Sequence, residues 1–197
     1  MHLRFAAAAL MLFASFGSAT AAQDVPKGDY QIDPAHTQIV FGIKHMGLST
    51  FYGTVGEVTG TLVADPQTPA KSTLDLKIDL TKVYTHVDKL TGELRDDLFK
   101  TAKFPTASFK ATNIATADTK TGTVTGDLTL HGVTKPVTLN VVFNGVRAMD
   151  KPTPTTRLGF DATATIKRSD FGLTDVAWSA FVGDEVTLLI EVELTKK

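Results

Sequence analysis

Apolar and polar side chains alternate with a period of two along most of the chain. The pattern is clearest over residues 38–45, 73–80, 124–130, 137–143, 158–166 and 186–194. Successive side chains of a β-strand point to opposite faces, so each run predicts a strand with one apolar and one mostly polar face. Weaker runs at 52–64 and 107–115 bring the expected number of strands to about eight.

Turn-forming residues separate the alternating runs. Segments 65–69, 119–122, 131–136 and 149–154 gather Pro, Gly, Asp and Thr between them. Regular short strands divided by such turns are typical of an antiparallel meander, folded as a sandwich or a barrel. No internal repeat or linker divides the chain, so we expect a single domain over residues 23–197.

One segment breaks the strand period. Val87, Leu90, Leu94 and Leu98 fall on one face of a helix of 3.6 residues per turn. Thr85 stands where a helix cap is needed, and an acidic residue follows three positions later. The spacing predicts one short helix near 85–99, between the third and fourth strands.

The apolar face of each strand predicts which side chains point inward. A closed barrel of about eight strands either fills its interior with side chains or holds one small ligand. Composition leaves both alternatives open, a plain hydrophobic core and a ligand cavity. The expected inward residues are Ile39, Phe41, Ile43, Leu74, Leu76, Ile78, Phe109, Leu128, Leu130, Leu139, Val141, Phe143, Phe160, Val186, Leu188 and Ile190.

The first 22 residues have the three parts of a secretory signal peptide in order. A short basic segment, Met1 to Arg4, precedes an apolar run, Phe5 to Phe16, and a small-residue segment that ends at Ala22. The apolar run is shorter than the roughly 20 residues that a bilayer span requires. We therefore expect cleavage after Ala21 or Ala22 and export of the remaining chain.

Charge and cysteine content exclude several classes of function. The formal net charge of -1 gives no electrostatic reason to expect nucleic acid or an anionic membrane as a partner. The chain has no cysteine, which excludes disulfides, thiol catalysis and cysteine metal sites. No later segment is long and apolar enough to predict stable insertion into a membrane.

Several ordered motifs extend along nearly all of the chain after the signal peptide. The strongest is residues 125–139, TGDLTLHGVTKPVTL. The others are residues 30–33 with His36, 44–47, 51–54, 60–61, 94–99, 103–109, 168–173 and 182–186. In these motifs the chain resembles the YceI-like family of periplasmic polyisoprenoid-binding proteins, and the stretch 85–93 is the loosest part of the resemblance.

The resemblance implies a lipocalin-like antiparallel β-barrel of eight strands with an elongated apolar tunnel. It implies a polyisoprenoid lipid or an isoprenoid quinone-like ligand, with the inward residues named above and His45 forming the binding wall. On this interpretation the protein binds, transports or stores lipid in the periplasm, is not an enzyme, and needs no cofactor. An enzyme acting on the lipid and a stress-related structural protein with a packed core remain the alternatives. Whether the chain forms a homodimer stays open.

The residues that could carry catalysis or hold a metal have simpler interpretations. Four histidines remain after processing, and the spacing of His36, His45, His86 and His131 matches no zinc pattern. His45 continues the inward face of its strand, where it either touches a ligand head group or makes an ordinary hydrogen bond, and we favour the second. His131 lies in a turn, where we expect it to be solvated. No serine stands in a nucleophile motif, and the paired carboxylates suit a solvated surface.

Overall fold

The computed structural model describes residues 25–150, 154–174 and 176–197, so the expected signal peptide lies outside the described residues. Within these ranges the chain forms ten strands joined as an antiparallel meander. Their bounds are β1 Gly28–Ile32, β2 Gln38–His45, β3 Ser49–Thr54, β4 Glu57–Ala64, β5 Thr73–Asp79, β6 Thr106–Thr116, β7 Thr121–Leu130, β8 Val133–Met149, β9 Thr155–Lys167 and β10 Val182–Lys196.

Short helical segments connect some of the strands. The longest continuous one runs from α1 into a wide helical turn, η3, and lies between β5 and β6. No helix in the described part of the chain has the length and apolar character needed to cross a bilayer. The bounds of the helical segments are η1 Pro69–Lys71, η2 Leu80–Lys82, α1 Asp88–Glu93, η3 Leu94–Leu98, η4 Arg168–Phe171 and η5 Ala177–Phe181.

The sheet closes on itself because β1 pairs with both β4 and β10. The closed ring contains the eight strands β1, β4, β5, β6, β7, β8, β9 and β10. Strand β2 continues along β10 beyond β1, and β3 pairs with β2 in turn. The expected all-β fold, an eight-stranded antiparallel barrel, is therefore confirmed.

The first two long strands of the meander are each interrupted. Residues 33–37 separate β1 from β2, and Val55 and Gly56 separate β3 from β4. Gly56 has a φ of +138°, and a Cβ atom there would come within 2.1 Å of the carbonyl oxygen of Asp79. Only glycine lets the two backbones approach so closely. The break between β3 and β4 therefore requires glycine at position 56.

The predicted position of the helix is wrong. It follows β5, the fifth strand, and not the third, because β1 was not expected and the single run expected at 52–64 forms two strands, β3 and β4. The helix also begins at Asp88, with Val87 as N-cap and no capping side chain. Thr85 is buried instead, and its hydroxyl group bonds to the carbonyl of Val87 and to the hydroxyl of Thr91. Thr85 therefore closes the loop before the helix.

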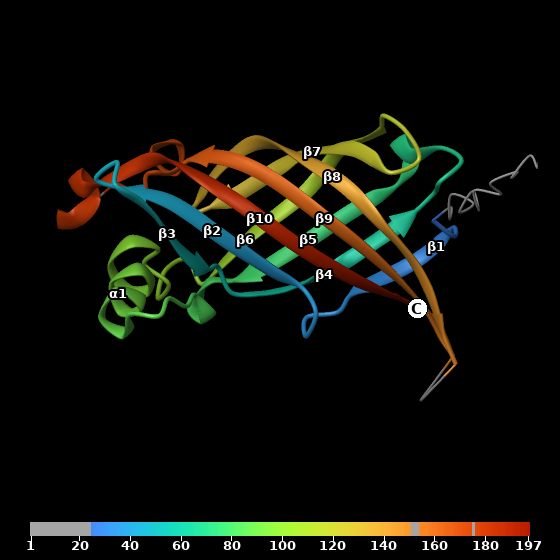
Figure 1. Ribbon diagram of the computed structural model, residues 1–197, viewed down its shortest axis with the longest axis horizontal. Helices are drawn as coiled ribbons and strands as arrows, with labels where there is room; N and C mark the ends of the chain where they lie inside the picture. Colours follow the sequence, from blue (N-terminus) through green and yellow to red (C-terminus); the bar gives the residue numbers. More distant parts are fainter. Residues whose placement is uncertain (1–24, 151–153, 175) are drawn as a thin grey trace, which may run out of the picture.

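The apolar faces of the strands meet inside the barrel in two clusters. The larger one contains Tyr30, Leu80, Leu158 and Leu194, all essentially without solvent exposure. The second gathers Phe109, Val124, Leu139, Ala162, Ala164 and Ile190 in the middle of the long strands. Figure 1 shows α1, the turn between β2 and β3, and the segment before β10 at one end of the barrel, and the C-terminus at the other. The interior between α1 and the second cluster holds the site.

Candidate functional site

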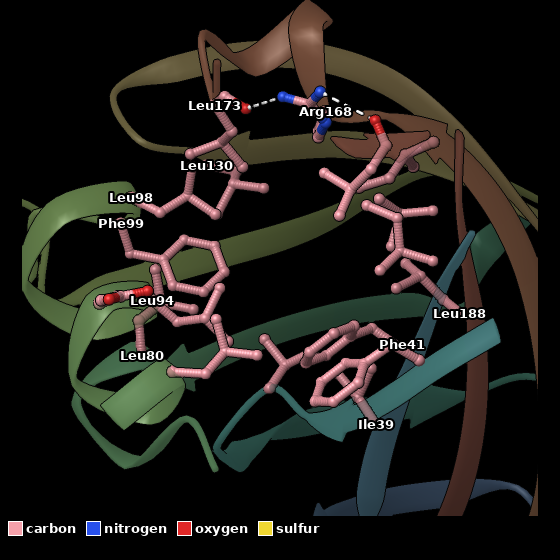
Figure 2. A pocket seen from close by; sticks show the side chains of 18 of the residues that line it. Ile39, Phe41, Leu80, Leu94, Leu98, Phe99, Leu130, Arg168, Leu173 and Leu188 are labelled. Carbon is pink, nitrogen blue, oxygen red and sulfur yellow. Dashed lines mark hydrogen bonds between the residues drawn. The ribbon is translucent and has the colours of Figure 1, made fainter. Parts of the chain in front are cut away.

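The barrel encloses an apolar cavity of about 520 Å³ at the end that α1 covers. Figure 2 shows its two walls, with Leu94 and Phe99 on the helical side and Phe41 and Leu188 on the strand side. Apolar side chains make up nearly all of the lining. A cavity of this size and character is typical of a site for an apolar small molecule.

Neighbouring strands β2 and β10 form the strand wall. Phe41 stands opposite Leu188 in the pairing of these strands, and Ile43 stands opposite Val186. Cross-strand neighbours point to the same face, so the period-two pattern of both strands places a continuous apolar surface toward the cavity. These side chains are only partly buried, because the cavity lies beside them.

The helical wall comes from the segment that broke the strand period. Leu90 belongs to α1, while Leu94 and Leu98 belong to η3, and all three line the cavity. Residues four apart fall on one face of a helix, so this spacing turns all three toward the barrel. Leu80 from η2 and Phe99 extend the wall, and both are buried.

Arg168 holds the segment that crosses over the cavity. Its side chain is only 9% exposed, and it lines the cavity. The guanidinium group donates to the carbonyl oxygens of Gly183 at 2.9 Å, Leu173 at 2.8 Å and Ser179 at 2.8 Å. Figure 2 shows the bond to Leu173. These bonds tie Leu173, Ser179 and Gly183 to the end of β9, so we assign Arg168 a structural role.

The same segment is fastened from its other side by Asp184. Its carboxylate accepts hydrogen bonds from the hydroxyl group of Ser169 at 2.7 Å and from the backbone N–H of Ser169 at 3.0 Å. Both bonds favour the charged carboxylate, so they hold the pKa of Asp184 below its ordinary value. The two anchors fix the cover of the cavity to the strands on either side.

The cavity opens to solvent beside the turn between β2 and β3. His45, Ser49 and Phe181 line the cavity and are also exposed, which marks its mouth. Phe51, another lining residue, stacks on the imidazole ring of His86 with a centroid separation of 5.3 Å. Glu93 of α1 is the acidic side chain of the lining, and its Oε1 lies 3.7 Å from Nζ of Lys89.

All of the residues expected to point inward lie in the barrel interior, but only some of them reach the cavity. Their role as ligand contacts stays a prediction. Those that line the cavity are Ile39, Phe41, Ile43, His45, Ile78, Leu128, Leu130, Val186 and Leu188. The others pack among side chains elsewhere in the interior, and these are Leu74, Leu76, Phe109, Leu139, Val141, Phe143, Phe160 and Ile190.

Sequence reasoning did not assign several lining residues to the site. Leu90, Leu94 and Leu98 carried a visible signal, since their helical spacing had been recognised and only its target was unknown. Arg168 carried none, because nothing in the pattern marks a buried arginine. The remaining members were not assigned to any site, and they are Ser49, Thr50, Phe51, Val55, Leu80, Glu93, Phe99, Ala107, Ile166, Leu173, Trp178, Phe181 and Val182.

A second group of ionisable side chains lies away from the cavity. Asp33, His36 and Glu193 stand close enough together to hold a metal ion. Arg157 already donates to Asp33 at 2.8 Å and to Glu193 at 2.9 Å, so its cation offsets part of the negative charge of the two carboxylates. The hydrogen bond with His36 is the main cause that holds the pKa of Asp33 below its ordinary value. The group is explained as an ion-pair network.

His131 is not solvated as expected. It is half-buried, its ring meets Phe104 edge to face at 4.6 Å, and its Nδ1 lies 3.3 Å from the carbonyl oxygen of Phe171. The turn that carries it packs under η4, whose position the sequence did not reveal. The residue therefore supports the fold near the cavity cover and does not line the cavity.

Known proteins share both this sequence and this architecture. The YceI-like domain matches residues 30–194. The protein YceI of Escherichia coli O157:H7 is 39% identical over 186 residues, which is 92% of this chain and 91% of that protein. A UPF0312 protein of Pseudomonas syringae pv. syringae is 36% identical over 148 residues, 74% of this chain and 76% of that protein.

Solved structures agree with the barrel. BcnA of Burkholderia cenocepacia superposes with a TM-score of 0.73 at 24% identity, covering 82% of this chain and 98% of BcnA. The Campylobacter jejuni YceI protein gives 0.67 at 30% identity, covering 78% and 90%. A polyisoprenoid-binding domain from Saccharophagus degradans gives 0.63 at 20% identity, covering 85% and 98%. Since the matched domain spans most of the chain and a relative of 39% identity covers nearly all of it, the chain belongs to the YceI-like family.

Proposed function

We propose that the protein binds a polyisoprenoid lipid in the cavity and carries or stores it in the periplasm. The observation that supports this proposal is the apolar cavity of about 520 Å³ under α1. The ligand class follows the Saccharophagus degradans domain, whose description names polyisoprenoid binding. A quinone precursor or a polyprenyl lipid has the required chain.

The energetics of burial favour such a ligand. Moving a CH₂ group from water into an apolar site yields roughly 0.8 kcal/mol, so a few isoprene units provide a large gross gain. Association costs at least several kcal/mol, and a flexible chain adds ordering costs, which the buried tail can offset. The lining supplies apolar area from two walls and places His45 and Ser49 at the mouth, where a polar head group would lie.

The sequence also indicates where the protein acts. Residues 1–22 carry the signal pattern, so we propose that the mature domain begins near residue 23 and acts outside the cytoplasm. A periplasmic carrier of this kind solves a physical problem, because a polyprenyl chain is almost insoluble in water. The cavity would shield the chain on its way through the aqueous compartment.

Extraction of the purified protein tests the proposal directly. The protein is extracted into organic solvent and the extract is analysed by mass spectrometry, with the lipid quantified per mole of protein. We expect a long-chain isoprenoid. An extract without lipid, together with no uptake of an added polyprenyl alcohol, would contradict the proposal. Chemical turnover of the bound lipid would favour the enzyme alternative.

A matched pair of variants locates the lipid. Leu188 points into the cavity, while Leu189, its neighbour on β10, is exposed on the outer face. Leu188→Trp should fill part of the cavity and lower the lipid content several-fold, at an overpacking cost of about 1–3 kcal/mol at most. Leu189→Trp adds the same atoms on the outside and should leave the lipid content unchanged. Equal lipid in both variants would place the ligand elsewhere.

A further inference from the structure

The rim of the cavity mouth carries apolar side chains that the fold leaves in solvent. Among the described residues, Leu48 is the most exposed large apolar side chain, at 82%. Met46 is 59% exposed and Phe181 is 53% exposed. The backbone N–H of Met46 donates to the carbonyl oxygen of Phe181 at 2.7 Å, so the three residues, here called the apolar rim, share one structural edge.

The rim surrounds the entrance that the ligand would use. Phe181 lines the cavity as well as facing solvent, and so do His45 and Ser49, which flank Met46 and Leu48 in sequence. Figure 1 shows the turn between β2 and β3 projecting at the end of the barrel next to the segment before β10. An apolar molecule that leaves the cavity at this end passes the apolar rim.

The turn itself favours a role outside the barrel core. Met46 and Gly47 have φ values of 52° and 72°, and the N–H of Leu48 bonds to the carbonyl of His45 at 2.9 Å, which is a tight hairpin turn of type I′. Asn, Asp or Gly normally occupies the first of these left-handed positions, and a bulky apolar residue is an outlier there. Met46 thus sits in a strained position that gains it no burial.

Charge along the hairpin indicates which partner the rim fits. Between Asp33 and Glu57 the sequence holds no acidic residue, and it carries the cation of Lys44 next to the turn. The two acids of the adjoining strand, Asp184 and Glu185, are offset by two cations, because Asp184 lies near Arg168 and Lys167 and Glu185 stands opposite Lys167. The net charge of the whole chain conceals this local arrangement. An apolar tip with a cation behind it complements an anionic lipid surface.

We propose that the apolar rim docks on the surface of an anionic lipid bilayer, with Met46, Leu48 and Phe181 in the head-group region. This inference rests on the proposed lipid-binding function, since it gives the cavity direct access to the membrane that holds the lipid. The docked mouth would let an apolar chain pass between bilayer and cavity without crossing water. Docking is shallow and reversible, because the rim is small.

Vesicle flotation of the purified mature chain tests the docking. Vesicles of phosphatidylcholine mixed with phosphatidylglycerol are compared with vesicles of phosphatidylcholine alone. We expect binding to the anionic vesicles, stronger by about fivefold than to the neutral ones, since one lysine near such a surface contributes about that factor. Equal binding to both compositions, or no binding to either, would overturn the proposal.

The variants Met46→Asn and Leu48→Ser each remove one exposed apolar side chain of the apolar rim without changing the core. Asn suits a left-handed backbone, so Met46→Asn should keep or raise thermal stability. Each change should lower the partition onto anionic vesicles by about tenfold, the loss expected for one buried apolar side chain. The controls Val63→Ser and Leu189→Ser remove exposed apolar side chains of β4 and β10 and should leave binding unchanged.

Two further readouts separate this inference from the proposed function. If the wild-type protein yields lipid on extraction but does not bind vesicles, docking is refuted and lipid binding stands. If the protein binds vesicles but yields no lipid, docking stands and the proposed lipid binding is contradicted. If the rim variants change the oligomeric state in size-exclusion chromatography and leave flotation unchanged, the rim is an interface between copies and the proposal is wrong.

Discussion

Replacement of Arg168 by methionine would test how the cavity cover is held. Methionine keeps the length of the apolar stem and removes the guanidinium group. The carbonyl oxygens of Gly183, Leu173 and Ser179 would then lose donors that lie 2.8–2.9 Å away. Part of the segment they belong to faces solvent, so water can satisfy some of these oxygens after a local shift.

The magnitude follows from opposing contributions. A hydrogen bond to a charged group is worth about 1.5–3 kcal/mol net, so three such bonds give roughly 4–9 kcal/mol if they are additive. Removing the buried cation also removes its desolvation penalty, which is several kcal/mol. We therefore expect Arg168→Met to lower the free energy of unfolding by about 3 kcal/mol, within the total of roughly 5–15 kcal/mol typical of a domain.

Urea denaturation of lipid-free protein measures this loss. The lipid must be removed first, because a ligand bound only to the folded state adds its own stabilisation. Lys167→Met is the matched control, since it makes a similar change one residue earlier on an exposed side chain and should shift stability by less than about 0.5 kcal/mol. If both variants unfold at the same urea concentration, the reasoning on Arg168 is wrong.

Three further predictions concern charge, chain length and processing. On the outer face of the barrel Glu191 stands opposite Asp161 and shares a hydrogen bond with it, which raises the pKa of Glu191 above its ordinary 4.5. The protonated form is favoured in the fold, so stability from this pair is present in acid and is lost as the pH rises through the raised pKa. Glu191→Gln should then stabilise the protein at neutral pH by a few tenths of a kcal/mol. Urea titrations should show that this gain disappears below about pH 4, where Glu191 is protonated in both states. The same difference in unfolding free energy at every pH would contradict the prediction. Phe109→Ala should open the packed region next to Leu128 and let the protein retain a longer isoprenoid chain, at a cost of about 3–5 kcal/mol in stability. An unchanged chain-length distribution in the mass spectrum would contradict the idea that Phe109 limits the length of the cavity. N-terminal sequencing of the exported protein should begin at Ala22 or Gln23, whereas uncut protein in the cytoplasm would argue against the signal peptide.

The strands could be predicted from sequence because they are governed by local alternation. Each strong run corresponds to a strand of the sheet, and these strands are β2, β5, β7, β8, β9 and β10. β1 was missed because it is five residues long and its only buried side chains are Tyr30 and Ile32. The break between β3 and β4 was missed as well, because it depends on the approach of Gly56 to the carbonyl oxygen of Asp79 on β5. Such contacts leave no periodic signal.

The site was harder to predict because alternation specifies a face and not a depth. Leu188 and Ile190 are two residues apart on β10, and the same pattern places both inside the barrel. Only Leu188 reaches the cavity, while Ile190 is buried in the second cluster. What separates them is the position along the strand relative to α1, which no strand pattern contains.

The difference between the packed and hollow parts of the interior lies in what stands opposite each strand. In the packed part the ring of Phe109 lies over Gly126, where a Cβ atom would be 2.5 Å from the ring tip. The ring therefore occupies the space that a side chain at Gly126 would take, and this part of the interior is filled. At the other end the strands face Leu94 and Leu98 across the cavity, from a helical segment that covers the opening. This helical segment covers the end of the barrel without filling it, and the space between its leucines and the strands is the cavity. The helical segment of α1 and η3, which interrupts the strand period, therefore forms one wall of the cavity. Its residues Leu90, Leu94 and Leu98 belong to the proposed binding site as much as the apolar residues of the strands do.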